Sequence, residues 1–213
     1  MKKDVRYIES EEIEIRSDDE TEEKFVEGIG IVYGRETEIL PGFLESVRKG
    51  AFDRSINGGK PKEIKSFFNH DPHSVLATTR SKPKLILEDT ERGLRFRAPI
   101  PPTTYGNDLT INLERKNVRG ASFSFSVDED VVTWDEKDVM HREIVRGTLY
   151  EIGPVTNPAY PSTKVGLRDA ESFLEERKKL IGDKKRADDA AAVARLELRK
   201  KITKNHELKG VDL

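Results

Sequence analysis

Alternating hydrophobic and polar residues run through the middle of the chain and predict β-strands. Leu85 and Leu87 precede a turn, and Leu94, Phe96 and Ala98 follow it at every second position. This spacing is typical of a β-hairpin. Further strands are predicted within residues 24–34, 63–72, 118–127 and 141–155.

Helical spacing occurs in two segments of the same region. The apolar residues of segment 43–56 predict a short amphipathic helix. Segment 104–117 predicts a second helix, with Leu109 and Leu113 on one face. Strands dominate and do not alternate regularly with helices. We therefore expect an α+β fold, a mainly antiparallel sheet or β-barrel flanked by helices.

Both ends of the chain differ from this middle region. Residues 1–23 hold ten Asp and Glu against four Lys and Arg, and predict an acidic, partly flexible N-terminus. Residues 24–168 form the predicted core domain. Residues 169–213 predict a charged helical tail, in which one narrow helical face carries Ala187, Ala191, Ala194, Leu198 and Ile202. Such a face suits docking on a partner or on a second copy, and equally a solvated helix with no role.

Charge and composition exclude several classes of function. The net charge is −2, which argues against nucleic acid as the main partner, because phosphate binding needs a basic excess. No apolar run approaches the ~20 residues of a membrane span, and we expect neither a signal peptide nor a membrane contact. The absence of cysteine excludes disulfides, zinc–thiolate sites and cysteine nucleophiles, and fits a reducing cytoplasm.

The strand that reads "RGASFSFS" raises the first question of chemistry. Side chains alternate between the two faces of a strand, so Ser122, Ser124 and Ser126 share one face. A buried strand would be expected to carry Val or Ile at these positions. Either this face meets water, or one serine is present for its oxygen.

A histidine and a carboxylate could complete a catalytic set with one of these serines. His70 lies where a strand ends, and Glu151 lies in an apolar strand, either at a sheet edge in water or buried with a partner. A Ser, a His and a carboxylate are the groups of a serine hydrolase, but periodicity neither selects the serine nor brings His70 to it. His70 and His73 are three residues apart, but Pro72 prevents the helix that would align their side chains for a metal ion. We therefore expect no metal or cofactor.

Four stretches of the chain carry a resemblance to a known family. They are "GIGIVYGRETEILPGFLESVRKGAFDRSI", "FFNHDPHSVLATT", "GLRFRAPIPPTTYGNDLTINLERKNVRGASFSFSV" and "LYEIGPVTNPAYPSTKVGLR". In this order and spacing, residues 25–168 resemble the prohead (capsid maturation) proteases of tailed bacteriophages. The resemblance implies a serine endopeptidase with the fold of the herpesvirus assembly proteases, a compact β-barrel ringed by helices.

The resemblance also implies roles for individual residues. It places the nucleophile at Ser122, the general base at His70 and the third member at Glu151. His141 is an alternative third member, because the herpesvirus enzymes use a second histidine there. The chain departs from the family pattern at Ser124, where Gly is frequent, and at Gly153, where Ser is frequent.

The resulting hypothesis is an enzyme that cleaves phage major capsid protein, its scaffold segment and itself inside the immature prohead in the host cytoplasm. The enzyme could form a homo-oligomer. The alternative is a non-catalytic assembly module that acts through the helical tail. A small-molecule esterase is disfavoured, because the chain lacks the G-x-S-x-G elbow around its serine.

Overall fold

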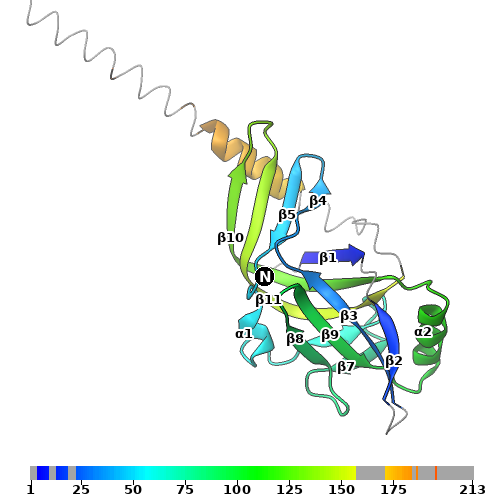
Figure 1. The fold of residues 1–213 in the computed structure, drawn as a ribbon. Coiled ribbons are helices and arrows are strands. Elements are labelled where there is room, and N and C mark those ends of the chain that lie inside the picture. Colours follow the sequence, from blue (N-terminus) through cyan, green and yellow to red (C-terminus); the bar gives the residue numbers. More distant parts are fainter. Residues whose placement is uncertain are drawn as a thin grey trace, which may run out of the picture. The chain divides into compact units, whose positions relative to one another are not determined.

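The structure, a computed structural model, describes residues 4–9, 13–18, 23–156 and 171–183 and the single positions 186 and 195. The chain divides into two compact units, residues 1–168 and 169–213. Figure 1 shows the strands and helices of the first unit with their labels.

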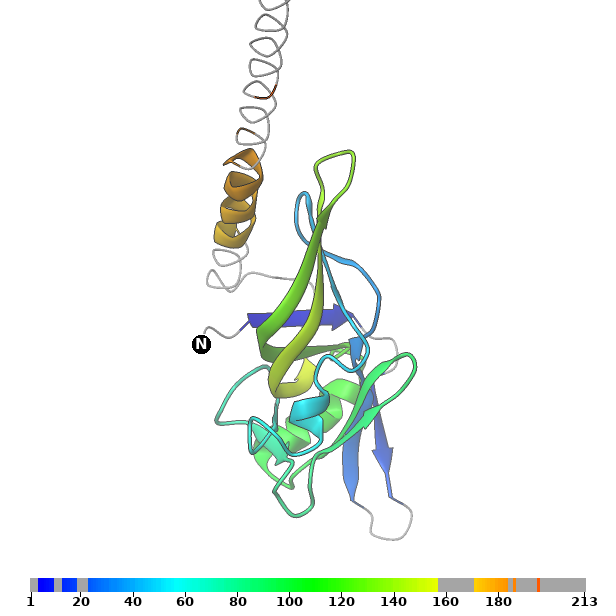
Figure 2. The same ribbon diagram turned by 90° about the vertical axis from the view of Figure 1, so that its left-hand side faces the viewer.

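The larger sheet of the first unit has seven strands around the long hairpin β10–β11. Its main path runs in the order β1 (Asp4–Glu9), β10 (Gly120–Trp134), β11 (Met140–Val155), β5 (Phe43–Val47) and β4 (Thr37–Leu40). A branch leaves β11 through β6 (Lys65–Phe67) to β7 (Val75–Thr78). Figure 2 shows β10 and β11 side by side along their length, with β1 across β10.

The smaller sheet is antiparallel throughout, and two helices accompany the sheets. Its strands lie in the order β2 (Glu14–Ser17), β3 (Lys24–Val32), β9 (Gly93–Pro99) and β8 (Ile86–Asp89). The helices are α1 (Asp53–Ile56) and α2 (Thr104–Glu114). The Thr103 side chain accepts a hydrogen bond from the Gly106 N–H, which satisfies one free donor at the start of α2.

The two sheets share one hydrophobic core. Phe123 and Phe125 of β10 project into it together with Phe96 of β9. The Phe52 ring, just before α1, packs edge-on against both β10 rings, with centroids 6.2 and 5.7 Å away. Edge-on packing is a favoured aromatic geometry. The core therefore fixes the face of β10 that carries the phenylalanines, and the serines take the opposite face.

The prediction of a β-barrel is wrong, although the mixed, strand-rich α+β class is confirmed. A barrel closes only when its last strand pairs with its first. Among the described strands, the smaller sheet ends at β2 and β8, and the main path of the larger sheet ends at β1 and β4. Both β5 and β6 pair with β11 in parallel, at different stretches of that strand. The larger sheet therefore branches at β11 and does not close.

The predicted helix within residues 43–56 is also wrong, because its first half is strand β5. Only residues 53–56 form a helical turn, as α1. Phe43, Glu45 and Val47 are the buried positions of β5. The middle one is a carboxylate, so the strand-like alternation is invisible to a hydrophobicity pattern. The hairpin predicted around residues 85–98 and the helix predicted within residues 104–117 are confirmed as β8–β9 and α2.

In the second unit, residues 171–183 form a helix. The Arg177 guanidinium lies 5.1 Å from the centre of the Phe173 ring one turn earlier. The predicted alanine-rich face begins at Ala187 and lies outside the described residues, so its role stays a prediction. Within the described residues, no helix combines the length and the apolar character that crossing a membrane would require.

Candidate active site

Strand pairing between β10 and β11 gathers four small or polar residues on one face. Ser122 lies opposite Gly153, and Ser124 lies opposite Glu151. Directly paired residues point to the same side of a sheet. The relative exposures of Ser122, Ser124 and Ser126 are 0, 6 and 2%. The structure therefore excludes the alternative in which the serine face meets water.

The chain reaches His70 through β6, which lies beside β11 with Lys65 opposite Glu151. After β6 the backbone enters the left-handed region twice in succession, at Asn69 (φ 55°) and at His70 (φ 58°). This conformation is uncommon for residues other than glycine, and each such residue costs of the order of 1 kcal/mol. Strained backbone of this kind persists only where surrounding contacts enforce it.

Asn69 supplies those contacts. Its backbone N–H donates to the Pro154 carbonyl oxygen at 3.1 Å, and its side-chain oxygen accepts from the Thr156 N–H at 2.8 Å. Both partners lie at or just past the end of β11, the strand that carries Glu151. Asn69 therefore fixes the position of the His70 loop relative to Glu151.

Asp71 closes the other side of the same loop. Its carboxylate accepts hydrogen bonds from the His73 N–H and the Ser74 hydroxyl, both at 2.9 Å. The bond from His73 is the main cause that lowers the pKa of Asp71. No cluster of three or more His, Asp or Glu able to hold a metal ion occurs among the described residues.

His70 contacts both of the other predicted catalytic residues. Its Nε2 lies 2.5 Å from the Ser122 Oγ, and its Nδ1 lies 2.7 Å from the Glu151 Oε1. The His70 side chain is 21% exposed and that of Glu151 is 12% exposed. Glu151 is therefore largely shielded from solvent beside a partner, and the alternative of a solvated sheet edge does not apply.

The hydrogen-bonding capacity of the three groups sets the protonation of the ring. An ionised carboxylate only accepts, so His70 Nδ1 carries a proton and donates it to Glu151. In the neutral imidazole, Nε2 then keeps its lone pair toward Ser122. This arrangement can remove the proton of the serine hydroxyl, which is the requirement for nucleophilic attack by serine.

His141, the alternative third member, lies at the other end of β11. Its Nδ1 is 2.6 Å from the Glu36 Oε1, and its Nε2 is 3.7 Å from the Asp135 Oδ2. The hydrogen bond with Glu36 is the main cause that raises the pKa of His141. The structure thus gives His141 carboxylate partners of its own and does not bring it to His70.

Sequence reasoning missed Arg6, whose backbone contacts Ser122. Strand β1 pairs antiparallel with β10, with Tyr7 opposite Ser122. The Ser122 hydroxyl lies 2.8 Å from the Arg6 carbonyl oxygen, to which it can donate. The alternation in "DVRYIE" is a signal for a strand, but nothing local to it indicates where that strand pairs.

Gly153 keeps the space through which the chain passes from β6 to His70. A Cβ atom at this position would lie 2.3 Å from the Phe67 carbonyl oxygen, a backbone atom that cannot rotate away. The absence of a side chain at Gly153 therefore allows β6 and the His70 loop to lie against β11.

We expect Gly153→Ala to lower the free energy of unfolding by about 1–3 kcal/mol, the usual effect of overpacking. It should also reduce peptidase activity, because the His70 loop must shift. Urea denaturation and peptide cleavage measure the two effects. Gly182→Ala is the control, since a Cβ there meets nothing within 4 Å; equal stability of the two variants would contradict the role given to Gly153.

Comparison with known proteins agrees with the resemblance seen in the sequence. The family model described as caudovirus prohead serine protease matches residues 11–176. Among solved structures, the bacteriophage T4 capsid assembly protease, gp21, is similar to this chain, with 14% identity and a TM-score of 0.46. That similarity covers 74% of this chain and 100% of the T4 chain. No curated protein matches the sequence.

Proposed function

Because the chain belongs to the caudovirus prohead serine protease family, and is thus a serine peptidase of capsid maturation, we propose that Ser122, His70 and Glu151 are its catalytic triad. We propose further that it cleaves the phage major capsid protein, its scaffold segment and itself. The observation that supports the triad is the unbroken run of contacts from Ser122 Oγ through His70 to Glu151, at 2.5 and 2.7 Å.

The proposed mechanism follows from these contacts. Ser122 Oγ attacks the carbonyl carbon of the scissile bond while His70 Nε2 takes the hydroxyl proton. Glu151 holds the ring with Nδ1 protonated and stabilises the imidazolium that forms. His70 then gives the proton to the leaving amine. In the second step His70 takes a proton from water, which attacks the acyl-enzyme, and returns that proton to Ser122 Oγ.

The site that holds Ser122 excludes most water. The Ser122 side chain is fully buried in the structure, and the Glu151 side chain is 12% exposed. Electrostatic interactions are stronger in such a site than in water, so the carboxylate acts strongly on the imidazolium. An extended substrate would reach this serine at the edge of β10 that β1 occupies in the structure, because β11 pairs with the other edge.

The direct test is to treat the full-length protein with a fluorophosphonate, which labels activated serines, and to map the modified residue by mass spectrometry. Incubation with purified capsid protein measures cleavage in parallel. We expect labelling at Ser122 and capsid fragments in the same preparation. Label on another serine, or neither label nor fragments, would refute the proposal.

The alternative role, assembly through the tail, is supported by the separate compact unit formed by residues 169–213. If the chain is a peptidase whose tail also acts in assembly, a chain that ends at Arg168 should keep peptidase activity on supplied capsid protein and enter assembling proheads poorly. Its thermal transition, its cleavage rate and its copy number per shell measure these properties. Loss of the cooperative transition would show that the tail belongs to the core, and normal incorporation would remove the proposed role of the tail.

A further inference from the structure

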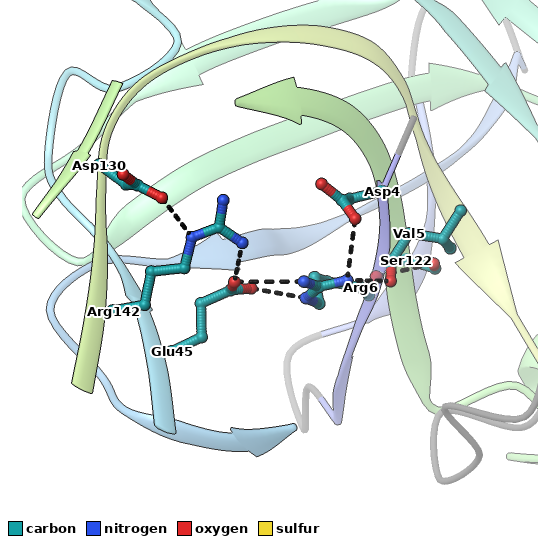
Figure 3. A network of polar contacts seen from close by, with 7 residues as sticks. All are labelled: Asp4, Val5, Arg6, Glu45, Ser122, Asp130 and Arg142. Carbon is teal, nitrogen blue, oxygen red and sulfur yellow. Dashed lines mark hydrogen bonds and ion pairs between the residues drawn. The ribbon is translucent and has the colours of Figure 1, made fainter. Parts of the chain in front are cut away.

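The Arg6 side chain is largely buried on the face of β10 that carries Phe123, its paired residue, and not on the serine face. Arg6 Nε lies 2.5 Å from Glu45 Oε1, and Arg6 Nη2 lies 3.1 Å from Glu45 Oε2 (Figure 3). The Arg6 side chain is only 11% exposed and that of Glu45 only 3% exposed. A guanidinium held by both oxygens of one carboxylate is a specific arrangement, because only the planar fork of arginine matches it.

The other walls of the pocket that holds the Arg6 side chain come from the core sheet. Arg142 Nη1 lies 3.1 Å from Glu45 Oε2, and Arg142 Nε lies 2.8 Å from Asp130 Oδ2. The Phe125 ring centre lies 5.6 Å from the Arg6 guanidinium carbon. We call Glu45, Asp130, Arg142 and Phe125 the Glu45 pocket.

The charges of the Glu45 pocket favour a cation. Glu45 and Asp130 carry two negative charges, and Arg142 carries one positive charge. Asp4, whose Oδ1 lies 3.9 Å from Arg6 Nη1, adds a further negative charge from β1 itself. Burial acts to lower the pKa of Arg6, but attraction to Glu45 and the hydrogen bonds with it outweigh burial and raise that pKa. The pocket thus keeps a buried arginine charged.

The backbone of Arg6 links this pocket to the nucleophile. The Arg6 carbonyl is the one that contacts Ser122, at 2.8 Å from Oγ to oxygen. Attack requires Ser122 Oγ to reach the carbonyl carbon of the residue before the scissile bond, so this contact places the Arg6 carbonyl next to the nucleophile, in a hydrogen bond that must break before attack. Strand β1 pairs with β10 at this point, as an extended peptide adds to the edge of a sheet. The residue whose side chain fills the Glu45 pocket is therefore also the residue whose carbonyl contacts Ser122.

From these contacts we infer that the Glu45 pocket selects arginine as the residue before the scissile bond, and that Arg6 occupies it as an internal substrate, so that the Arg6–Tyr7 bond is cleaved. The inference rests on the proposed function, since it takes Ser122 as the nucleophile. The substrate class that it names is an extended peptide with arginine before the bond.

The reaction at this bond balances with water alone. Ser122 Oγ forms an ester with the Arg6 carbonyl carbon, and the bond from that carbon to the Tyr7 nitrogen breaks. The serine proton passes through His70 to the Tyr7 amine. Water then hydrolyses the ester and leaves a carboxylate on Arg6, at the end of the released segment MKKDVR, and a restored Ser122 hydroxyl.

Until cleavage, β1 competes with external substrates. It occupies the edge of β10 and the Glu45 pocket, and its carbonyl competes with His70 for the single proton of the Ser122 hydroxyl. Departure of the segment that ends at Arg6 empties the Glu45 pocket and removes the carbonyl contact of Ser122, and a substitution that expels the Arg6 side chain empties the pocket. Activity on added peptides should therefore rise after this event.

The first experiment follows the intact mass of the full-length protein over time. We expect the wild type to lose MKKDVR, Arg6→Lys to lose it about 10- to 100-fold more slowly, and Arg6→Glu and Ser122→Ala to keep it. Arg16→Ala is the matched control, because Arg16 is an exposed arginine of β2 paired with Glu14; it should behave as the wild type. An uncut Arg6–Tyr7 bond in a wild type that cleaves itself elsewhere, or cleavage there in Arg6→Glu, overturns the inference.

The second experiment measures kcat/KM of full-length Arg6→Glu on peptides that differ only in the residue before the bond. Arginine should exceed lysine and alanine by about 10- to 100-fold, and glutamate should be the poorest, because it meets Glu45. Adding Glu45→Gln should reduce the preference for arginine over alanine to within a few-fold. If the variant that carries Glu45→Gln shows no cooperative thermal transition, the preference profile of Arg6→Glu alone tests the inference.

The outcomes separate this inference from the proposed function. Fluorophosphonate labelling at Ser122 with a preference for a residue other than arginine would overturn the Glu45 pocket and leave the peptidase intact. Failure of both labelling and cleavage would overturn both proposals. We expect labelling at Ser122 together with a preference for arginine before the bond. We also expect Glu45→Gln to abolish that preference.

Discussion

Ser122→Ala should abolish proteolysis, with a fall in kcat/KM on the order of 10⁴- to 10⁶-fold. The substitution removes the single oxygen that lies 2.5 Å from His70 Nε2 and leaves the β-carbon packed in β10. The fold should therefore persist. Cleavage of capsid protein and fluorophosphonate labelling report the loss, and a thermal transition near that of the wild type shows that folding is unaffected.

Ser124→Ala is the control for this prediction, because Ser124 is a buried serine on the same face of the same strand. It should keep most of the activity, since it is the Ser122 oxygen that lies 2.5 Å from His70 Nε2. An inactive Ser124→Ala beside an active Ser122→Ala would reverse the assignment of the nucleophile.

The elements that the sequence predicts well are those that depend on residues near one another. The β8–β9 hairpin and helix α2 are examples, because turn and periodicity signals are contained within each segment. The absence of barrel closure depends on which strands meet at the sheet edges. Such pairing joins residues far apart in the chain, so alternation within one strand does not report it.

The candidate site was only partly predictable for the same reason. The residue types were visible, but the approach of His70 to Ser122 depends on two left-handed residues and on the fit of Phe67 against Gly153. Local hydrophobicity carries no signal for either feature. The resemblance to the family supplied the choice among the serines that periodicity left open.

Glu45 and Arg6 show a second limit of hydrophobicity patterns. Glu45 occupies a core-facing position of β5, where a pattern expects an apolar residue. It is stabilised there by two arginines, from β1 and β11, that are far from it in the sequence. Buried carboxylates without such partners are strongly disfavoured. The Glu45 carboxylate interrupts the hydrophobic alternation of β5 in the sequence. The same carboxylate gives the Glu45 pocket its proposed specificity.

Glu151→Gln is expected to lower kcat on the order of 10⁴-fold while the fold is kept, because glutamine has nearly the same shape but no negative charge. The amide no longer stabilises the imidazolium, and its NH₂ group can donate to His70 Nδ1 and so favour the wrong tautomer. Single-turnover cleavage of an arginine peptide measures the chemical step directly. KM should change little, since the Glu45 pocket and the edge of β10 are untouched.

His141→Gln provides the comparison that identifies the third member. Removal of the His141 imidazole, at the other end of β11, should leave kcat within a few-fold of the wild type. His141 bonds to Glu36 and does not contact His70. A His141→Gln enzyme that loses activity while Glu151→Gln retains it would transfer the role to His141. If both variants keep full activity, His70 acts without a third partner, and the contact at 2.7 Å with Glu151 is structural only.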